Sequence, residues 1–328
     1  MLRIIRNLSA VTLVFSAACG SYAQAQAESW PQKPVTYILP SAAGGSPDVL
    51  SRLVMNKVAE YIKVPVVVEN RGGAAGSIGM VQLKKAAADG YNIGYGNINT
   101  LAVNRSLFNK LNYDVEKDFE PVIHLFNLYN VLIVPADSSV NTVAELIDKA
   151  KKNPEKLSYG ASGVGTTGHM GGELFKSMAK VPAEFIPYTG GPAAMQDLIG
   201  GRLDFMFINS SEAIPMIKSG KVRALGVSSL KRLPSLPDVP TLDEAGVKGY
   251  ETIAWGGVVA PAGTPKEIVD KLNAAMQTAI KDPDVVKGLD ALGAEPGGGT
   301  PGDFATLYDA ETKKWSNIIE SAGIEKLN

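Results

Sequence analysis

The sequence has few of the side chains that bind metals or carry out covalent catalysis. Its 328 residues include one cysteine, Cys19, and two histidines, His124 and His169. The histidines are far apart and no His-Glu-x-x-His segment is present, so we expect no metal and no cofactor. No Gly-x-Ser-x-Gly segment occurs, and a Ser-His-Asp triad would need one of these two histidines. We expect no catalysis, although a catalytic carboxylate pair stays open because spacing across loops is invisible in a sequence.

The chain also lacks an excess of charge of either sign. It has 32 Lys and Arg against 33 Asp and Glu, a net charge of −1, so we expect no nucleic-acid partner. Hydrophobic residues make up 45% and charged residues 20%, which excludes a wholly disordered chain. The length exceeds the roughly 100 to 200 residues of one typical domain, so we expect two lobes.

The first residues have the three parts of a secretory signal peptide. Arg3 and Arg6 precede an apolar stretch from Leu8 to Cys19, and small residues follow at 23–27. A membrane span needs about 20 apolar residues, and this stretch has only about 12. We take residues 1–27 as the signal peptide, with cleavage after Ala27 or, alternatively, after Ala25. We expect the mature protein to be periplasmic. A lipoprotein anchored through Cys19 is less well supported, because Ser16 stands where an aliphatic residue is usual.

Strand-like segments alternate with helix-like segments along the mature chain. This order predicts an α/β protein of two lobes, each a mostly parallel sheet flanked by helices. Passages near 125–130 and 252–256 are expected to cross between the lobes. Lobe 1 would then contain residues 28–127 and 252–328, and lobe 2 residues 128–251, with a ligand in the cleft between them. The expected strands are Val35–Pro40, Val64–Asn70, Tyr91–Asn97, Val131–Pro135, Leu157–Ala161, Ala183–Tyr188, Leu203–Asn209, Val222–Ser228 and Gly257–Ala260.

Several helices carry start signals. Thr142 with Glu145, and Thr264 with Glu267, have the spacing of capping boxes. Three glycine-rich loops at 40–48, 158–169 and 188–194 each follow a strand and precede a helix. Such loops expose backbone N–H groups at the positive end of the helix dipole, which suits an anion. Each loop alone is also ordinary strand-to-helix turn chemistry, so the inference depends on all three sharing this design.

The second loop also allows a nucleotide interpretation. Gly163, Gly165 and Gly168 have the spacing of a dinucleotide fingerprint, with Glu184 at about the distance of a ribose contact. The motif lies in mid-chain, and exported proteins seldom meet soluble NAD. A phosphate loop of the Walker type fits less well, since His169 and Met170 stand where lysine and a hydroxyl residue are needed.

The mature chain resembles the Bug family, the periplasmic solute-binding proteins of tripartite tricarboxylate transporters. The resemblance covers essentially the whole mature chain and depends on the number and order of individually weak motifs. These are Trp30-Pro-x-Lys33-Pro34, Pro40 with Gly44-Gly45 and Asp48, Val68-Glu69-Asn70-Arg71, Tyr113-Asp114, Lys117-Asp118-Phe119-Glu120-Pro121, Gly165-Thr166-Thr167-Gly168-His169, Gly201-Arg202-Leu203-Asp204, Leu236-Pro237-Asp238-Val239-Pro240-Thr241 and Ala260-Pro261-Ala262-Gly263-Thr264-Pro265.

The resemblance implies a Venus-flytrap fold that closes on a small carboxylate, gripped by backbone groups, hydroxyls and water rather than by an arginine. Transferred position by position, it implies three groups of ligand-binding residues. The first loop supplies Ser41, Ala42, Ala43, Gly44, Gly45 and Asp48; the second supplies Ser162, Gly163, Gly165, Thr166, Thr167 and His169; and Asn97, Thr100, Tyr188 and Asn209 line the cleft.

Four positions depart from the family's habits, which leaves the identity of the ligand open. Ser41 and Ala43 replace a usual aromatic residue and proline, Gly72 replaces a usual proline, and Ile208 a usual aspartate. The leading hypothesis is a monomeric binding protein that delivers a dicarboxylate, tricarboxylate, aromatic acid or acidic amino acid to membrane transporter subunits. A dinucleotide-binding enzyme and a ligand-sensing subunit that docks on a sensor protein are the alternatives.

Overall fold

The computed structural model describes residues 30–152, 157–321 and 324–327. The expected signal peptide, residues 1–27, lies outside the described residues. Within the described ranges, no helix is long and apolar enough to cross a membrane.

The strands form one mixed sheet of ten strands. Their order is β2-β1-β3-β9-β4-β7-β5-β6, and β10 and β8 also pair with β4. The pairings at the two outer ends of the sheet are parallel, and those that involve β4 or β9 are antiparallel. The strands are β1 Val35–Leu39, β2 Val66–Asn70, β3 Asn92–Asn97, β4 Phe119–Pro135, β5 Leu157–Gly160, β6 Ala183–Ile186, β7 Phe205–Asn209, β8 Val222–Val227, β9 Ile253–Pro261 and β10 Ala294–Gly298.

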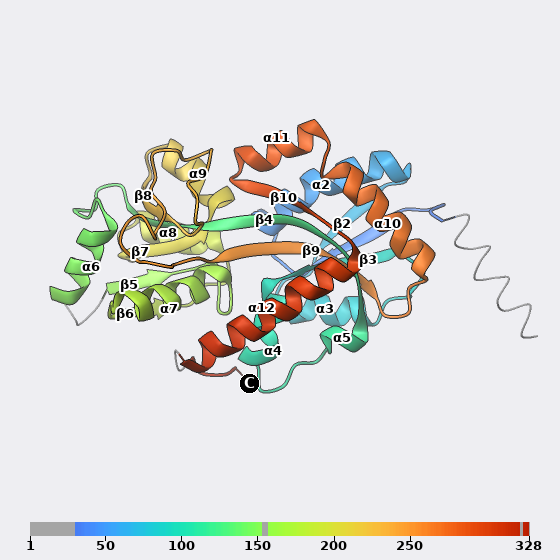
Figure 1. Ribbon diagram of the computed structural model, residues 1–328, viewed down its shortest axis with the longest axis horizontal. Coiled ribbons are helices and arrows are strands. Elements are labelled where there is room, and N and C mark those ends of the chain that lie inside the picture. Colours follow the sequence, from blue (N-terminus) through green and yellow to red (C-terminus); the bar gives the residue numbers. More distant parts are fainter. Residues whose placement is uncertain (1–29, 153–156, 322–323, 328) are drawn as a thin grey trace, which may run out of the picture.

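The pairing of β4 changes along its length and divides the sheet into two halves. Up to Tyr129, β4 pairs with β9 and β10, and from Asn130 it pairs with β7 and β8. We call the part with β1, β2, β3, β9 and β10 the terminal half, because both chain ends build it. The part with β5 to β8 is the middle half. The long strands β4 and β9 run along the molecule between them (Figure 1).

Helices cover both faces of each half. In the middle half, Leu132 and Val134 of β4 share a core with α6 and α7, whereas Val131 and Ile133 share one with α8 and α9. This follows from the alternation of side chains along a strand. The helices are α2 Ser46–Ile62, α3 Ser77–Lys84, α4 Asn104–Leu107, α5 Val115–Asp118, α6 Val143–Lys152, α7 Thr167–Ala179, α8 Gly191–Ile199, α9 Ser210–Lys218, α10 Lys266–Ala279, α11 Pro283–Ala291 and α12 Pro301–Ser321, with the short turns η1 Ala74–Gly76 and η2 Ile98–Val103.

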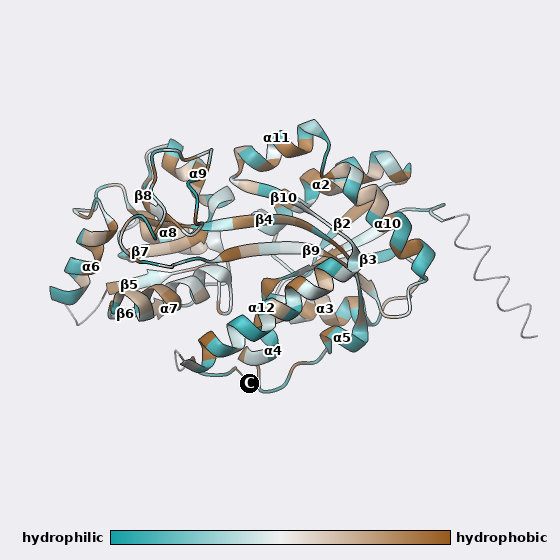
Figure 2. Cartoon of the chain, viewed as in Figure 1, coloured by the Kyte–Doolittle hydropathy of each residue, from teal (hydrophilic) through white to brown (hydrophobic). Residues whose placement is uncertain are grey.

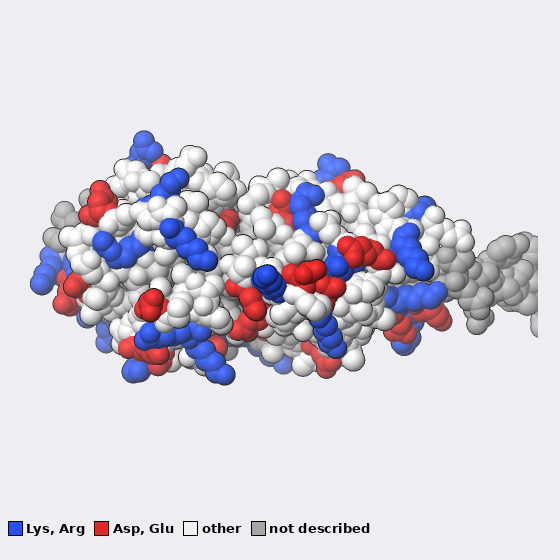
Figure 3. All heavy atoms as spheres, turned by 90° about the horizontal axis from the view of Figure 1, so that it is seen from above, with Lys and Arg blue, Asp and Glu red and all other residues white. Residues whose placement is uncertain are grey.

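The central strands are mostly apolar, as a sheet covered on both faces requires (Figure 2). The terminal half has α2, α10 and α11 on one side of the sheet, and α3, η2 and α12 on the other. Acidic and basic side chains are interspersed on the face seen in Figure 3. This mixed surface agrees with the near-zero net charge and shows no single-sign field on that face.

The passages at 125–130 and 252–256, which were expected to cross between the lobes, lie in β4 and, from Ile253, in β9, so both connections between the halves are extended strands. Two local expectations differ from the structure. Strand β10 was not expected, because its sequence Ala-Glu-Pro-Gly-Gly has little strand propensity and pairing with β4 decides its conformation. The Thr264–Glu267 capping box is wrong: Thr264 donates its hydroxyl to the Pro261 carbonyl, and no side chain caps α10.

Candidate ligand-binding site

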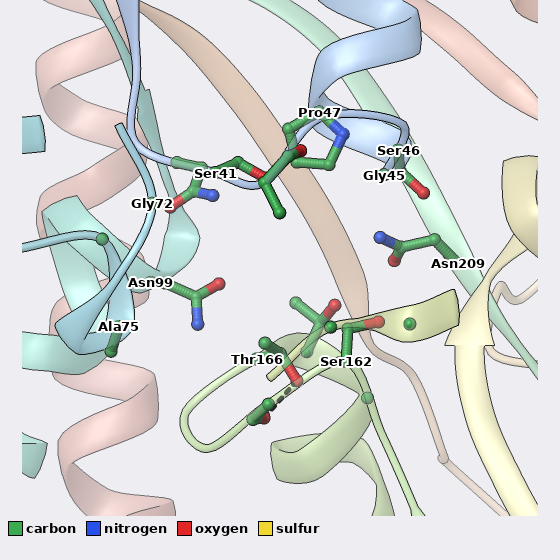
Figure 4. A pocket seen from close by; sticks show the side chains of 18 of the residues that line it. Ser41, Gly45, Ser46, Pro47, Gly72, Ala75, Asn99, Ser162, Thr166 and Asn209 are labelled. Carbon is green, nitrogen blue, oxygen red and sulfur yellow. Dashed lines mark hydrogen bonds between the residues drawn. The ribbon is translucent and has the colours of Figure 1, made fainter. Parts of the chain in front are cut away.

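A cavity of about 890 Å³ lies between the two halves of the molecule. Segments from the terminal half, such as 40–47, 72–76 and 95–100, form one wall, and segments at 162–168, 188–192 and 207–212 form the other. In Figure 4, Ser41 and Asn99 face Ser162 and Asn209 across it. The halves also touch directly, since Asn99 donates a side-chain hydrogen bond to the Gly165 carbonyl.

The first loop faces the cavity with its backbone, and Asp48 holds this backbone in place from the side away from the cavity. Gly45 is the N-cap of α2, and its own loop supplies no side-chain cap. In the first turn the Ser46 N–H bonds the Glu212 carboxylate, Pro47 has no N–H, and the Asp48 N–H donates to the Gly45 carbonyl at 3.0 Å. Asp48 accepts a 2.9 Å hydrogen bond from the Gly44 N–H and is bound by Arg52 and Asn70. Burial acts to raise the pKa of Asp48, but these hydrogen bonds and the Arg52 charge outweigh it and hold the pKa below its usual value.

Of the residues expected in the first loop, four line the cavity and two do not. Ser41, Ala42, Ala43 and Gly45 line it, whereas Gly44 and Asp48 are absent from its wall. The left-handed φ of Gly44, +79°, turns the chain toward α2, and Asp48 holds that turn in place. These two residues therefore shape the loop from behind.

The second loop is held together by its own hydroxyl and imidazole groups. Thr166 is the N-cap of α7: its Oγ1 accepts a hydrogen bond from the His169 N–H and donates one to the Gly163 carbonyl at 2.7 Å (Figure 4). His169 Nδ1 accepts the Gly165 N–H at 3.1 Å. Ser162, Gly163, Thr166 and Thr167 line the cavity, but Gly165 and His169 do not.

His169 is a buried support of this loop. Its side chain packs against Phe185, with ring centroids 4.0 Å apart and ring planes tilted by 35°. Burial lowers the pKa of His169 to about 4; the Glu173 charge opposes this effect and the Lys176 charge adds to it. The ring is therefore neutral at pH 7 and able to accept from the Gly165 N–H. His124 is also partly buried, bonded to the Phe126 carbonyl, and is absent from the cavity wall.

The remaining four expected residues all line the cavity. Asn97 and Thr100 cap each other at the start of η2. Tyr188 donates its hydroxyl to Asp197 at 2.8 Å, so it presents mainly its ring. Asn209 accepts from the Asn130 amide at 3.0 Å through Oδ1, which leaves its own amide N–H groups for another partner.

Part of the cavity wall was not expected from the sequence. The missed residues include the loop at 72–76, Asn99, Asn130, Trp255 and Glu212. The glycines at 72, 73 and 76 were a usable signal for the loop, in which Ala74 and Ala75 adopt left-handed φ angles of 45° and 51°. Asn130 Oδ1, Glu212 Oε2 and Trp255 Nε1 are buried without a hydrogen-bond partner in the described part of the chain. No sequence signal marked these three as members of one site.

The electrostatics of the cavity come from helix ends. The N-cap residues of α2, α7, α8 and α9 are Gly45, Thr166, Gly190 and Asn209, and all of them line the wall. Among its described lining residues there is no Lys, Arg or His, and Glu212 is the one acid. Converging helix N-termini supply partial positive charge and N–H donors. This arrangement can hold an anion without a basic side chain. Glu184, the residue required by the dinucleotide interpretation, is exposed on β6 and outside the wall.

A mixed α/β sheet with flanking helices and a cavity between two halves is the structure of a periplasmic solute-binding protein. A family model for the tripartite tricarboxylate transporter family receptor matches residues 50–324. The chain belongs to this family, which is made of binding receptors rather than enzymes and includes the Bug proteins.

Relatives and solved structures agree along nearly the whole chain. The UPF0065 protein in the tcbD-tcbE intergenic region of Pseudomonas sp. (strain P51) is 40% identical over 89% of this chain and 87% of its own. Protein BugT of Bordetella pertussis is 32% identical over 97% and 98%. The structure of R. palustris Rpa4515 with adipate has a TM-score of 0.88 and 38% identity, covering 91% of this chain and 100% of that one. MatC (Rpa3494) from Rhodopseudomonas palustris with bound malate has a TM-score of 0.82 and 32% identity, covering 88% and 100%.

Proposed function

We propose that this protein captures a small carboxylate in the periplasm and delivers it to a tripartite tricarboxylate-type transporter. The observation that carries the proposal is the convergence of four helix N-termini on one cavity whose described wall has no basic side chain. The ligands named for the two similar structures, adipate and malate, are both small dicarboxylates. A carboxylate held by N–H groups and hydroxyls fits the wall described above.

In this proposal the terminal and middle halves are lobes that close on the ligand, with β4 and β9 as the connections. The protein acts as a monomer that is exported through its signal peptide, and the closed form is the one that membrane transporter subunits engage. The ligand-contacting residues are the expected ones that line the cavity, and Gly44, Asp48, Gly165 and His169 support their loops. Ser41, Ala43 and Gly72, which depart from the family's habits, also line the wall, so the ligand is not transferred from any one relative.

Thermal melting with matched ligands tests the proposal. Adipate, malate, citrate and benzoate are compared with their uncharged amides, which have nearly the same shape without the negative charge. A ligand present at 100 times its Kd stabilises the folded state by about 2.7 kcal/mol, so at least one acid raises the midpoint while its amide does not. Mass spectrometry of the ligand retained through purification identifies the natural compound. If neither these acids nor the acidic amino acids L-aspartate and L-glutamate raise the midpoint, or if the amides do so equally, the carboxylate assignment is wrong.

A further inference from the structure

Glu212 lies where helix N-termini meet, in the first turn of α9. A Cβ placed on Gly191, in the first turn of α8, would be 2.8 and 3.0 Å from the two Glu212 carboxylate oxygens. A Cβ on Gly45, the N-cap of α2, would be 3.6 Å from Glu212 Oε1. A side chain at position 191 would require this carboxylate to move from its observed position. Glu212 is thus enclosed between both halves, in the wall of the cavity that we assign to the ligand.

The negative charge of Glu212 is only partly compensated by the protein. Ser46 hydrogen-bonds the carboxylate through its backbone N–H and hydroxyl, and Ser211 in turn donates to the Ser46 hydroxyl at 2.6 Å. Oε2 is buried and has no partner among the described groups, and no described Lys, Arg or His forms an ion pair with Glu212. Burial raises the pKa of Glu212 to about 7, and the Ser46 hydrogen bonds oppose this effect.

A second unpartnered acceptor lies near Glu212. Asn130 is paired with Asn209 in the β4–β7 register, and Asn209 immediately precedes α9. Asn130 donates to Asn209, while its own Oδ1 is buried without a partner. Asn130, Asn209 and Glu212 all line the cavity. This end of the cavity therefore needs hydrogen-bond donors, and a buried carboxylate in addition needs a cation.

A ligand with an ammonium group supplies both the hydrogen-bond donors and the positive charge that this end of the cavity lacks. A dicarboxylate without a hydrogen-bond donor would place negative charge beside the buried Glu212 carboxylate. No basic side chain in the described wall would reduce the repulsion between them. An ammonium group has a full positive charge and three N–H donors. A carboxylate on the same ligand would meet the N–H groups of the helix ends, and the ammonium group would meet the cavity-facing side of Glu212.

We propose that Glu212 is the specificity-determining residue of the cavity and binds the ammonium group of an amino acid, in preference to the acid that lacks this group. This inference rests on the proposed function, because it assumes that the cavity binds a carboxylate. It narrows the ligand class to compounds that have an ammonium group close to a carboxylate.

Calorimetric titration of matched pairs tests the inference. The pairs are L-glutamate and glutarate, L-aspartate and succinate, and L-phenylalanine and 3-phenylpropionate, which differ only by the amino group. We expect the amino acid of at least one pair to bind at least tenfold more tightly to the wild-type protein. In Glu212→Gln this preference disappears through a loss of at least tenfold in the affinity for the amino acid. Glu320→Gln, which removes an exposed charge on α12, retains the preference.

The outcomes separate the two proposals. Equal or tighter binding of every desamino acid to the wild type overturns the role of Glu212 and leaves the carboxylate receptor intact. The same conclusion follows if Glu212→Gln keeps the wild-type preference. If no acid of either kind binds, both proposals fail. Glu212→Ser, which also removes the charge, replaces the glutamine variant if that variant does not fold.

Discussion

Single residues near the cavity divide into those that face it and those that hold the loops in shape. Asp48 and His169 bond the backbone of their own loops from behind, and the Thr166 hydroxyl also bonds its own loop, although Thr166 lines the cavity as well. In each case the side chain fixes N–H or carbonyl groups that would otherwise vary in direction. Ser162 and Asn209, by contrast, extend toward the centre of the cavity (Figure 4). Some side chains can therefore contact a ligand directly, whereas others contribute by orienting the backbone groups that do so.

Replacing Thr166 by valine is expected to destabilise the protein by about 1 kcal/mol, because α7 loses its N-cap hydroxyl. Thr166→Ser retains the hydroxyl and is expected to stay close to the wild type. Urea denaturation of the two variants measures the difference. A full loss of ligand affinity in the valine variant with unchanged stability would show that the hydroxyl contacts the ligand instead.

The stability of the protein is expected to depend on His169 at acidic pH. Its pKa is about 4 in the folded state and about 6.5 in the unfolded state, so the unfolded state binds the proton more readily. The contribution of His169 is complete above pH 6.5 and is lost as the pH falls toward 4, by about 3 kcal/mol in total. His169→Asn, whose amide oxygen can also accept the Gly165 N–H, removes this dependence.

The measurement is the difference in the free energy of unfolding between the two proteins from pH 4 to pH 7. The variant is compared with the wild type at each pH because Glu212 makes the stability of both proteins depend on pH in the opposite direction. Its folded-state pKa of about 7 is raised, so its contribution is present below about pH 4.5 and is lost as the pH rises toward 7. A pH-independent difference between the variant and the wild type would contradict the assignment to His169.

At the scale of elements, close contact between helices and strands explains several glycines. In α7, a Cβ on Gly168 would be 2.4 Å from the Phe207 carbonyl oxygen, and one on Gly172 would be 2.2 Å from the Tyr159 ring. The helix therefore lies directly on β5 and β7. The glycines of the apparent dinucleotide motif thus have two functions: Gly163 and Gly165 permit left-handed turns, and Gly168 permits helix–sheet contact.

Gly168→Ala is expected to lower the free energy of unfolding by about 1 to 3 kcal/mol, because the new methyl group meets backbone that cannot rotate away. Gly302→Ala in α12 is the matched control. Its Cβ would meet nothing nearer than 3.7 Å, so we expect no loss and a gain of up to about 1 kcal/mol. Urea denaturation of both variants measures the effects, and an equal response would refute the close-contact explanation.

At the scale of the whole molecule, a few hydrogen bonds join the two halves in addition to β4 and β9. Ser211 donates to Ser46 at 2.6 Å, Ser210 donates to the Gly293 carbonyl at 2.9 Å, and Asn99 donates to the Gly165 carbonyl. Two of the three start from the first turn of α9. This turn therefore connects the cavity wall to the contact between the halves. If the halves close on a ligand as proposed, we expect binding at Glu212 to influence closure.

Ser211→Ala removes one of these contacts and is expected to shift the protein toward separated halves. A net loss of about 1 kcal/mol corresponds to about a fivefold weaker ligand affinity. Small-angle scattering without ligand should show a larger radius of gyration than for the wild type. Ser219→Ala is the control, because the Ser219 hydroxyl bonds the Met216 carbonyl within the same segment. An unchanged affinity and radius in Ser211→Ala would exclude a role of this contact in closure.

The positions of most strands and the three glycine-rich loops could be predicted from local patterns, because apolar runs and helix start signals act over a few residues. The direction of side chains within those loops could not. Thr166 and His169 are three residues apart in the same loop, and yet one lines the cavity and the other is buried against Phe185. The residues around Glu212 are also distant in sequence, so no local pattern connects them.

By itself, the sequence determined the α/β class, the family and the presence of helix N-termini that suit an anion, since these depend on periodicity, turn residues and motif order. Its shortage of cysteine and histidine already pointed away from metal and thiol chemistry. The tertiary structure decided which N-termini meet, that β4 and β9 connect the halves as strands, and that Glu212 stands among the helix ends. These features result from packing between segments that are far apart in the chain. The residues next to Glu212 in the sequence therefore do not show that its carboxylate lies at the cavity.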